Sequence, residues 1–201
     1  MKKQLVAGLV ALGVIGASTS AFADYDYTVK SGDTFWKIAD KTHTGIDEII
    51  SANPQVKNIN MIYPNQKLTI PTLDQASQSY EQQVISLVNK ERQKAGLKPL
   101  KENWELSRVA RFKSQDMHDK GYFDHNSPTY GSPFKMIKDF GISYNYAGEN
   151  IAYGQRTPEE VMKAWMNSSG HRANILSPNF TQIGVGYVKD GNYWTQQFIS
   201  Q

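Results

Sequence analysis

Cysteine is absent from this chain of 201 residues. Disulfide bonds, thiolate metal ligands and thiol nucleophiles are therefore excluded. An exported protein of this size without disulfides must be held together by the packing of its core.

A large excess of charge of one sign is also missing. The chain has 22 Lys and Arg against 19 Asp and Glu, a formal net charge of +3. Without Lys2 and Lys3, which belong to the first segment, the net charge is +1. Nucleic-acid-binding proteins normally carry a basic stripe, so we expect no nucleic-acid partner.

Long apolar runs are confined to the first 23 residues. Lys2 and Lys3 precede the apolar run Leu5–Ala17, and Ala21-Phe22-Ala23 closes the segment. This pattern predicts a secretory signal peptide over residues 1–23, with an uncleaved membrane anchor as the alternative. No later segment approaches the roughly 18 apolar residues of a second span. We expect an exported chain that begins at Asp24 and has no stable membrane span.

The segment 26–71 predicts four short elements. Alternation over 27–30 favours a strand, and Asp33 or Thr34 can cap a following helix. A second helix is expected over 45–52, and a strand over 67–71.

These residues resemble the LysM family along the whole segment. The similarity rests on Tyr27-Thr-Val-Lys-Ser-Gly-Asp-Thr34, Asn53-Pro54 and Ile62-Tyr-Pro-Asn-Gln-Lys-Leu-Thr-Ile-Pro71. It implies a βααβ fold that binds peptidoglycan or another N-acetylglucosamine-containing glycan. The groove that it implies consists of Gly32, Asp33, Thr34, Phe35, Asn60, Ile62, Tyr63 and Pro64.

A polar stretch, residues 72–79, predicts a short linker before a second domain over 80–201. Helices are expected over 80–94 and 103–120, around 134–140, and from Pro158 onward. The spacing of apolar residues then changes from the helical to the strand period. A hairpin is predicted over residues 183–188 and 193–199. Helices followed by strands indicate an α+β fold.

This second domain is similar to the bacterial branch of the CAP superfamily, the SCP-like extracellular domain. The motifs that carry the similarity are Tyr122-Phe-Asp-His125, Ala147-Gly-Glu-Asn-Ile-Ala152, Trp165-Met-Asn-Ser168 with Gly170-His171-Arg172, and Ile183-Gly-Val-Gly186. The resemblance implies an α-β-α sandwich with a cleft that contains histidine and acidic residues.

His125, Glu149 and His171 are the candidate catalytic residues of that cleft. Two imidazoles and a carboxylate are sufficient ligands for zinc with an open position. Without a metal, Glu149 would raise the pKa of a neighbouring histidine for acid–base chemistry. Purely structural roles are also open, with Glu149 accepting backbone hydrogen bonds and His171 capping a helix end. His43 and His118 are expected to be surface residues.

The sequence departs from the eukaryotic pattern of two histidines and two acids in the cleft. Ser168 occupies the position of the second acid, and Asn179 occupies that of the second histidine. These replacements argue against a four-residue zinc site, and the metal content stays unknown from the sequence.

Three functions remain open. The first is a secreted, cell-wall-associated protein that binds peptidoglycan through its LysM module and presents a CAP domain to a ligand or partner. The second is a wall-acting hydrolase that uses His125, Glu149 and His171. The third is a structural protein of a cell surface or spore layer. The sequence does not decide whether the protein is an enzyme.

Overall fold

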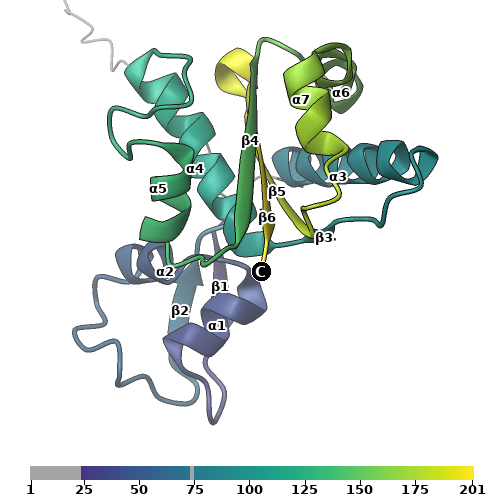
Figure 1. Ribbon diagram of the computed structural model, residues 1–201. Helices are drawn as coiled ribbons and strands as arrows, with labels where there is room; N and C mark the ends of the chain where they lie inside the picture. Colours follow the sequence, from purple (N-terminus) through teal and green to yellow (C-terminus); the bar gives the residue numbers. More distant parts are fainter. Residues whose placement is uncertain (1–23, 73–74) are drawn as a thin grey trace, which may run out of the picture.

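The computed structural model describes residues 24–72 and 75–201. A small unit with two strands and two helices lies beside a larger unit in which helices cover both faces of a sheet (Figure 1). The expected fold class, a βααβ module followed by an α-β-α sandwich, is confirmed. The predicted signal peptide, residues 1–23, lies outside the described residues.

The small unit has the predicted order of elements. Strand β1 (Tyr25–Thr28) pairs antiparallel with β2 (Lys67–Ile70), and helices α1 (Phe35–Thr42) and α2 (Ile46–Ala52) lie between them. The Thr34 side chain caps α1 by accepting a hydrogen bond from the Lys37 amide. The core consists of Tyr27, Val29, Phe35, Ile38, Ala39, Ile49, Leu68 and Ile70.

The larger unit is built on a four-stranded sheet with the order β3-β5-β6-β4. Its strands are β3 (Lys101–Glu102), β4 (Tyr146–Tyr153), β5 (Gln182–Val188) and β6 (Tyr193–Ser200). All neighbours are antiparallel except β3 and β5. Because β4 ends the order, it is an edge strand.

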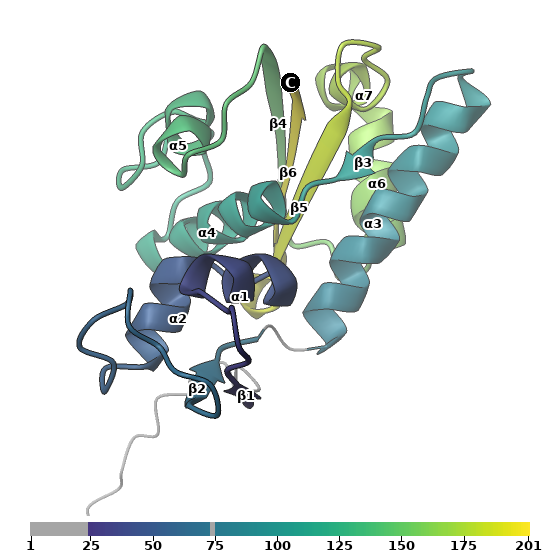
Figure 2. The same ribbon diagram turned by 90° about the horizontal axis from the view of Figure 1, so that it is seen from below.

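Helices form a layer on each face of this sheet (Figures 1 and 2). One layer holds α4 (Trp104–Lys120) and α5 (Pro133–Asp139). The other holds α3 (Gln75–Lys94), α6 (Pro158–Asn167) and α7 (Ser169–Ile175). A short 3-10 turn, η1 (Asp190–Asn192), joins β5 to β6.

Two glycines bring α4 unusually close to β5. A Cβ at Gly184 would lie 2.3 Å from the backbone carbon of Leu106, and one at Gly186 would lie 2.2 Å from that of Ala110. The side chain of Ser114 then donates to Thr195 Oγ1 at 2.8 Å, which fixes α4 across the sheet. This close packing brings side chains of α4 next to polar residues of the sheet.

Three features differ from the expectations. Helix α3 begins at Gln75 rather than near residue 80, so part of the predicted linker is helical. The Gly-Glu-Asn segment is strand β4, which was not predicted. His171 does not cap the end of α6; it lies within a separate helix, α7.

The small unit contacts the beginning of α4 through the turn between α1 and α2 (Figure 2). Arg108 donates to both carboxylate oxygens of Glu48, at 2.5 and 2.6 Å. His43 stacks on Trp104 with the ring centroids 5.5 Å apart. His43 is therefore exposed, as expected, but also takes part in the contact between the two units.

Candidate functional site

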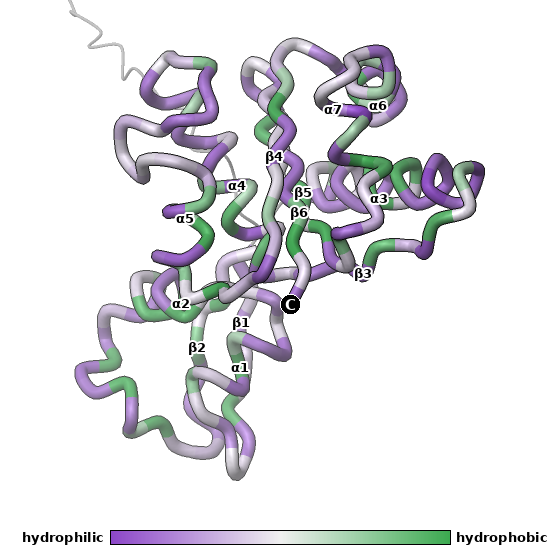
Figure 3. Tube along the Cα trace, viewed as in Figure 1, coloured by the Kyte–Doolittle hydropathy of each residue, from purple (hydrophilic) through white to green (hydrophobic). Residues whose placement is uncertain are grey.

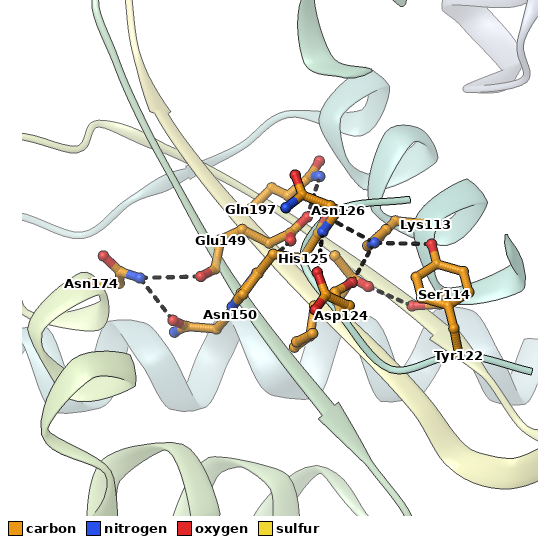
Figure 4. A network of polar contacts seen from close by, with 12 residues as sticks. Lys113, Ser114, Tyr122, Asp124, His125, Asn126, Glu149, Asn150, Asn174 and Gln197 are labelled. Atoms are coloured by element: carbon orange, nitrogen blue, oxygen red, sulfur yellow. Dashed lines mark hydrogen bonds and ion pairs between the residues drawn. The ribbon is translucent and has the colours of Figure 1, made fainter. Parts of the chain in front are cut away.

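Glu149 lies at the centre of the site, on the edge strand β4. Its side chain is 2% exposed. One carboxylate oxygen is 2.8 Å from Nδ1 of His125, and the other accepts a hydrogen bond from Nε2 of Gln197 at 3.0 Å (Figure 4). The histidine beside Glu149 is thus His125, and the carboxylate has a partner at each oxygen.

His125 lies in the loop after α4, and its side chain is 49% exposed. The hydrogen bond to Glu149 is the main cause that raises the pKa of His125 above its ordinary value, and burial opposes it. Nδ1 is held by the carboxylate, and about half of the His125 side chain is open to solvent.

Lys113 joins the His125 loop to α4. Its side chain on α4 is fully buried, and burial lowers its pKa. The ammonium donates to the carbonyl oxygens of Asp124 and His125, at 2.6 and 3.0 Å, and to the hydroxyl of Tyr122 at 3.0 Å (Figure 4). Two loop carbonyls on one buried cation fix the backbone that carries the imidazole.

Asp116, one turn further along α4, holds the other end of this loop. It accepts hydrogen bonds from the hydroxyls of Tyr122 at 2.6 Å, Ser127 at 2.6 Å and Thr129 at 2.5 Å. Burial alone would raise the pKa of Asp116, but these hydrogen bonds outweigh it, and the pKa is lowered. The carboxylate is therefore charged in the fold, and the loop is anchored at both sides of His125.

His171 approaches from the other helical layer. Its backbone carbonyl accepts a hydrogen bond from the Asn150 amide at 3.1 Å. Asn174, on the same helix, donates to the Glu149 carbonyl at 3.2 Å and to Oδ1 of Asn150 at 2.9 Å. Burial, and secondly the charge of His125, lower the pKa of His171. The two histidines thus influence each other, and their pKa values are shifted in opposite directions.

The residues do not fit a metal centre. Within residues 24–72 and 75–201, no group of three His, Cys, Asp or Glu side chains could hold a metal ion. Neither Ser168, at the end of α6, nor the exposed Asn179 is hydrogen bonded to His125 or Glu149 in this part of the chain. We therefore derive no chemistry that passes through zinc.

The predicted glycan residues are spread over two loops of the small unit. Phe35 is 2% exposed, so its ring belongs to the core and any contact with a glycan is through its backbone. The Asp33 carboxylate accepts from the Tyr27 hydroxyl and the Lys30 amide, both at 2.8 Å, which shapes the first loop.

The second loop, between α2 and β2, is exposed although it has apolar residues (Figure 3). It forms a groove of about 580 Å³, lined by residues 55–58, Met61 and residues 63–66. Tyr63 and Pro64, both predicted for glycan binding, line this groove.

Lys113, Gln197 and Asn174 are among the site residues that were not predicted. Lys113 lies in a helix where a lysine ordinarily indicates a solvated face. Gln197 lies within a predicted strand, but the polar run Thr195-Gln196-Gln197 shows no alternation that would single it out. Nothing in the local sequence indicates that Asn174 joins α7 to β4.

Family models match both parts of the chain. The LysM domain model matches residues 27–71, and the model of the cysteine-rich secretory protein family, CAP, matches residues 85–198. In the part of the chain that the structure describes, no helix has the length and apolar character needed to cross a bilayer.

Curated relatives match over part of their length. The chain is 70% identical over 123 residues to protein YkwD of Bacillus subtilis, covering 61% of this chain and 48% of YkwD. It is 35% identical over 72 residues to the N-acetylmuramoyl-L-alanine amidase sle1 of Staphylococcus saprophyticus, covering 35% of this chain and 21% of that enzyme. The chain thus spans about half or less of these relatives.

Among solved structures, an extracellular protein containing an SCP domain from Bacillus anthracis is similar, with a TM-score of 0.61 and 32% identity. The similarity covers 69% of this chain and 47% of that one. The CAP model alone matches more than half of the chain. The protein therefore belongs to the cysteine-rich secretory protein (CAP) family, and its CAP domain follows a LysM domain.

Proposed function

We propose that this protein is secreted, associates with the cell wall by binding peptidoglycan through its LysM domain, and presents the His125–Glu149 cleft of its CAP domain to a wall ligand. The LysM match over residues 27–71 carries the proposal, because LysM domains imply peptidoglycan binding. The extracellular SCP-domain neighbour and the partial match to a wall amidase support it.

Binding to insoluble peptidoglycan tests this function. Among the described residues, the core of the small unit consists of residues between 27 and 70, and the two cores of the CAP domain consist of residues between 80 and 199. A fragment 75–201, which keeps α3 whole, therefore has a complete core of its own. Residues 24–201 should sediment with peptidoglycan, and fragment 75–201 should stay largely in the supernatant. Equal sedimentation of the two would refute the role of the LysM domain.

A second candidate is hydrolysis of wall material by acid–base catalysis. The opposite pKa shifts of His125 and His171 favour it, because such pairs supply an acid and a base at one pH. His125, with its raised pKa, would be the proton donor. His171, with its lowered pKa, would be the neutral proton acceptor, and Glu149 would hold the donor ring through Nδ1.

Incubation of residues 24–201 with muropeptides tests this candidate. New products should form, and they should disappear with His125→Ala and Glu149→Gln. The rate should fall both below the pKa of His171, which is lowered from 6.5, and above that of His125, which is raised from it, so that it is highest between the two pKa values. The absence of any product across glycan, peptide and ester substrates would leave ligand binding as the function.

A further inference from the structure

Three aromatic side chains form an exposed patch close to His125. Phe123 is 52% exposed and Tyr153 is 53% exposed, while Tyr193 is partly buried. The ring centroids of Phe123 and Tyr153 are 6.2 Å apart, and those of Tyr153 and Tyr193 are 4.7 Å apart. We call these three residues the aromatic platform. Large exposed rings in mutual contact are unusual on a soluble surface and mark binding sites.

Three separate elements supply the platform, which holds it in place. Phe123 lies in the loop after α4, Tyr153 ends β4, and Tyr193 begins β6 as the cross-strand partner of Tyr153. A Cβ at Gly191 would lie 2.6 Å from the Tyr193 ring, so the turn of η1 packs directly on that ring. His118 meets Tyr193 edge-on with the centroids 6.0 Å apart. The Tyr193 ring is therefore held in place before any ligand arrives, and it supports the Tyr153 ring, which reduces the entropic cost of binding.

The platform leads to the His125–Glu149 pair. Tyr153 and Glu149 are four residues apart on β4, which puts them on the same face at about 13 Å along the strand. Phe123 precedes His125 by two residues, on the loop that Lys113 fixes. A short chain that lies on the rings can therefore extend to the imidazole. Tyr153 ends β4 at the end of the sheet away from the LysM domain, and Glu149 lies near the middle of that strand (Figure 1).

The rim of the platform is polar, with two carboxylates and the His118 imidazole that pairs with one of them, Asp190. Asp124 follows Phe123 directly, and Asp190, whose side chain is 87% exposed, precedes the turn to Tyr193. Sugar rings match this composition, because their C–H faces stack on aromatic rings while their hydroxyls bond to carboxylates and phenols at the edge. The same carboxylates would repel an anionic lipid surface.

We propose that the aromatic platform binds neutral N-acetylhexosamine residues of a glycan strand and guides the strand to the His125–Glu149 pair. This inference rests on the proposed function, since it takes the wall as the place where the CAP domain acts. The LysM domain holds the protein on the wall, and the platform is a second, weaker glycan site of the same chain.

Nuclear magnetic resonance of residues 24–201 can separate the two sites. The probe is the tetrasaccharide of β-1,4-linked N-acetylglucosamine. Gly154 and Gly191 report on the platform, and Gly32 reports on the predicted LysM groove. Titration should shift the amide signals of all three. Tyr153→Ala and Phe123→Ala should weaken the affinity derived from Gly154 and Gly191 about tenfold, while the affinity derived from Gly32 stays the same.

Tyr146→Ala is the matched control, because Tyr146 is also an exposed tyrosine of β4, at 59% exposure, but lies at the other end of the strand. It should leave all three signals and affinities as in the unmodified chain. A response of Gly32 without Gly154 and Gly191 would overturn the platform and leave wall binding by the LysM domain intact. No response at all would contradict both proposals. Shifts of Gly154 and Gly191 with phosphatidylglycerol vesicles but not with the sugar would assign the platform to a lipid and overturn the inference.

Discussion

At the scale of single residues, one buried carboxylate gives the site its chemical character. Glu149 accepts hydrogen bonds from His125 and Gln197, and it raises the pKa of His125. The pKa of His171 is instead lowered, mainly by burial. The pKa values of the two histidines shift in opposite directions because His125 is the one that is hydrogen bonded to Glu149.

Replacing Glu149 with Gln should therefore lower the pKa of His125. Gln has the same shape, and the Gln197 amide can reverse because its Oε1 has no hydrogen-bond partner among the described residues. The fold should be kept while the charge that favours imidazolium is lost. A titration of the His125 ring signals by nuclear magnetic resonance measures the change. Glu91→Gln is the control, because among the described residues the Glu91 carboxylate forms its ion pair with Lys94 near the surface. It should leave the pKa of His125 unaltered. An unshifted His125 in Glu149→Gln would show that the carboxylate does not control it.

At the scale of the elements, those with strong local signals were predictable. Helix α4 begins after Asn103, whose side chain caps it, and ends at Gly121 in the left-handed conformation. Helix α6 begins with Thr157 and Pro158 for similar reasons. Caps, turns and apolar periodicity are local properties, so the sequence alone contains them.

Elements that depend on distant partners were not predictable. Strand β4 contains Gly148, Glu149 and Asn150, which have poor strand propensity, but their buried groups find partners on β6 and α7. The buried charge of Lys113 is stable only because loop carbonyls from residues 124 and 125 surround it. The location of the candidate site could be predicted from its motifs, whereas its supporting contacts required the fold.

The close approach of α4 to β5 leaves no room for a side chain at Gly186. Gly186→Ala should destabilise the protein by about 1–3 kcal/mol, because its Cβ would overlap the backbone of Ala110. Gly170→Ala is the matched control: it lies in α7, and no atom outside its own turn would be within 4 Å of the new Cβ. The free energy of unfolding of the Gly170→Ala variant should differ from that of the unmodified chain by less than about 0.5 kcal/mol. Equal effects in urea denaturation would contradict the packing argument.

His118 joins the end of α4 to η1 and should make that contact depend on pH. It contacts Asp119 at 2.7 Å and Asp190 at 3.1 Å, so the expected surface residue bridges two carboxylates. The hydrogen bond to Asp119 is the main cause that raises its pKa above 6.5. Its contribution to stability is therefore complete below pH 6.5 and is lost as the pH rises through the raised pKa.

The stability difference between the unmodified chain and His118→Gln measures this contribution. It should be larger at about pH 5.5 than at about pH 8.5. Urea denaturation at the two pH values, with His43→Gln as a control at a histidine without a carboxylate partner in the described residues, gives both differences. A difference independent of pH would show that the two carboxylates do not bind the imidazolium.

At the scale of the whole molecule, the two domains are joined by more than the chain. Arg108 pairs with Glu48 and lies over the rings of Phe112 and Phe140, each 5.2 Å from its guanidinium carbon. A bidentate pair over aromatic rings favours one orientation of the LysM domain on the CAP domain. The LysM domain and the His125–Glu149 pair then keep a fixed spatial relation.

A double-mutant cycle of Glu48→Gln and Arg108→Gln should show this coupling. The interaction free energy should be roughly 1 kcal/mol, which lies within the range for residues in direct contact. In calorimetry we expect one transition for the unmodified chain, and each single variant should separate the unfolding of the two domains. Additive effects with unchanged cooperativity would mean that the domains move independently.

Retention on peptidoglycan by an intact but groove-altered chain tests the central claim most directly. Tyr63 is 59% exposed and lines the groove of the LysM domain, so Tyr63→Ala should weaken binding about tenfold without loss of fold. Tyr25→Ala, at a tyrosine of β1 that is 44% exposed and outside that groove, is the control. The account predicts that sedimentation of residues 24–201 falls with Tyr63→Ala and stays unchanged with Tyr25→Ala. Equal sedimentation of both variants and the unmodified chain would contradict it.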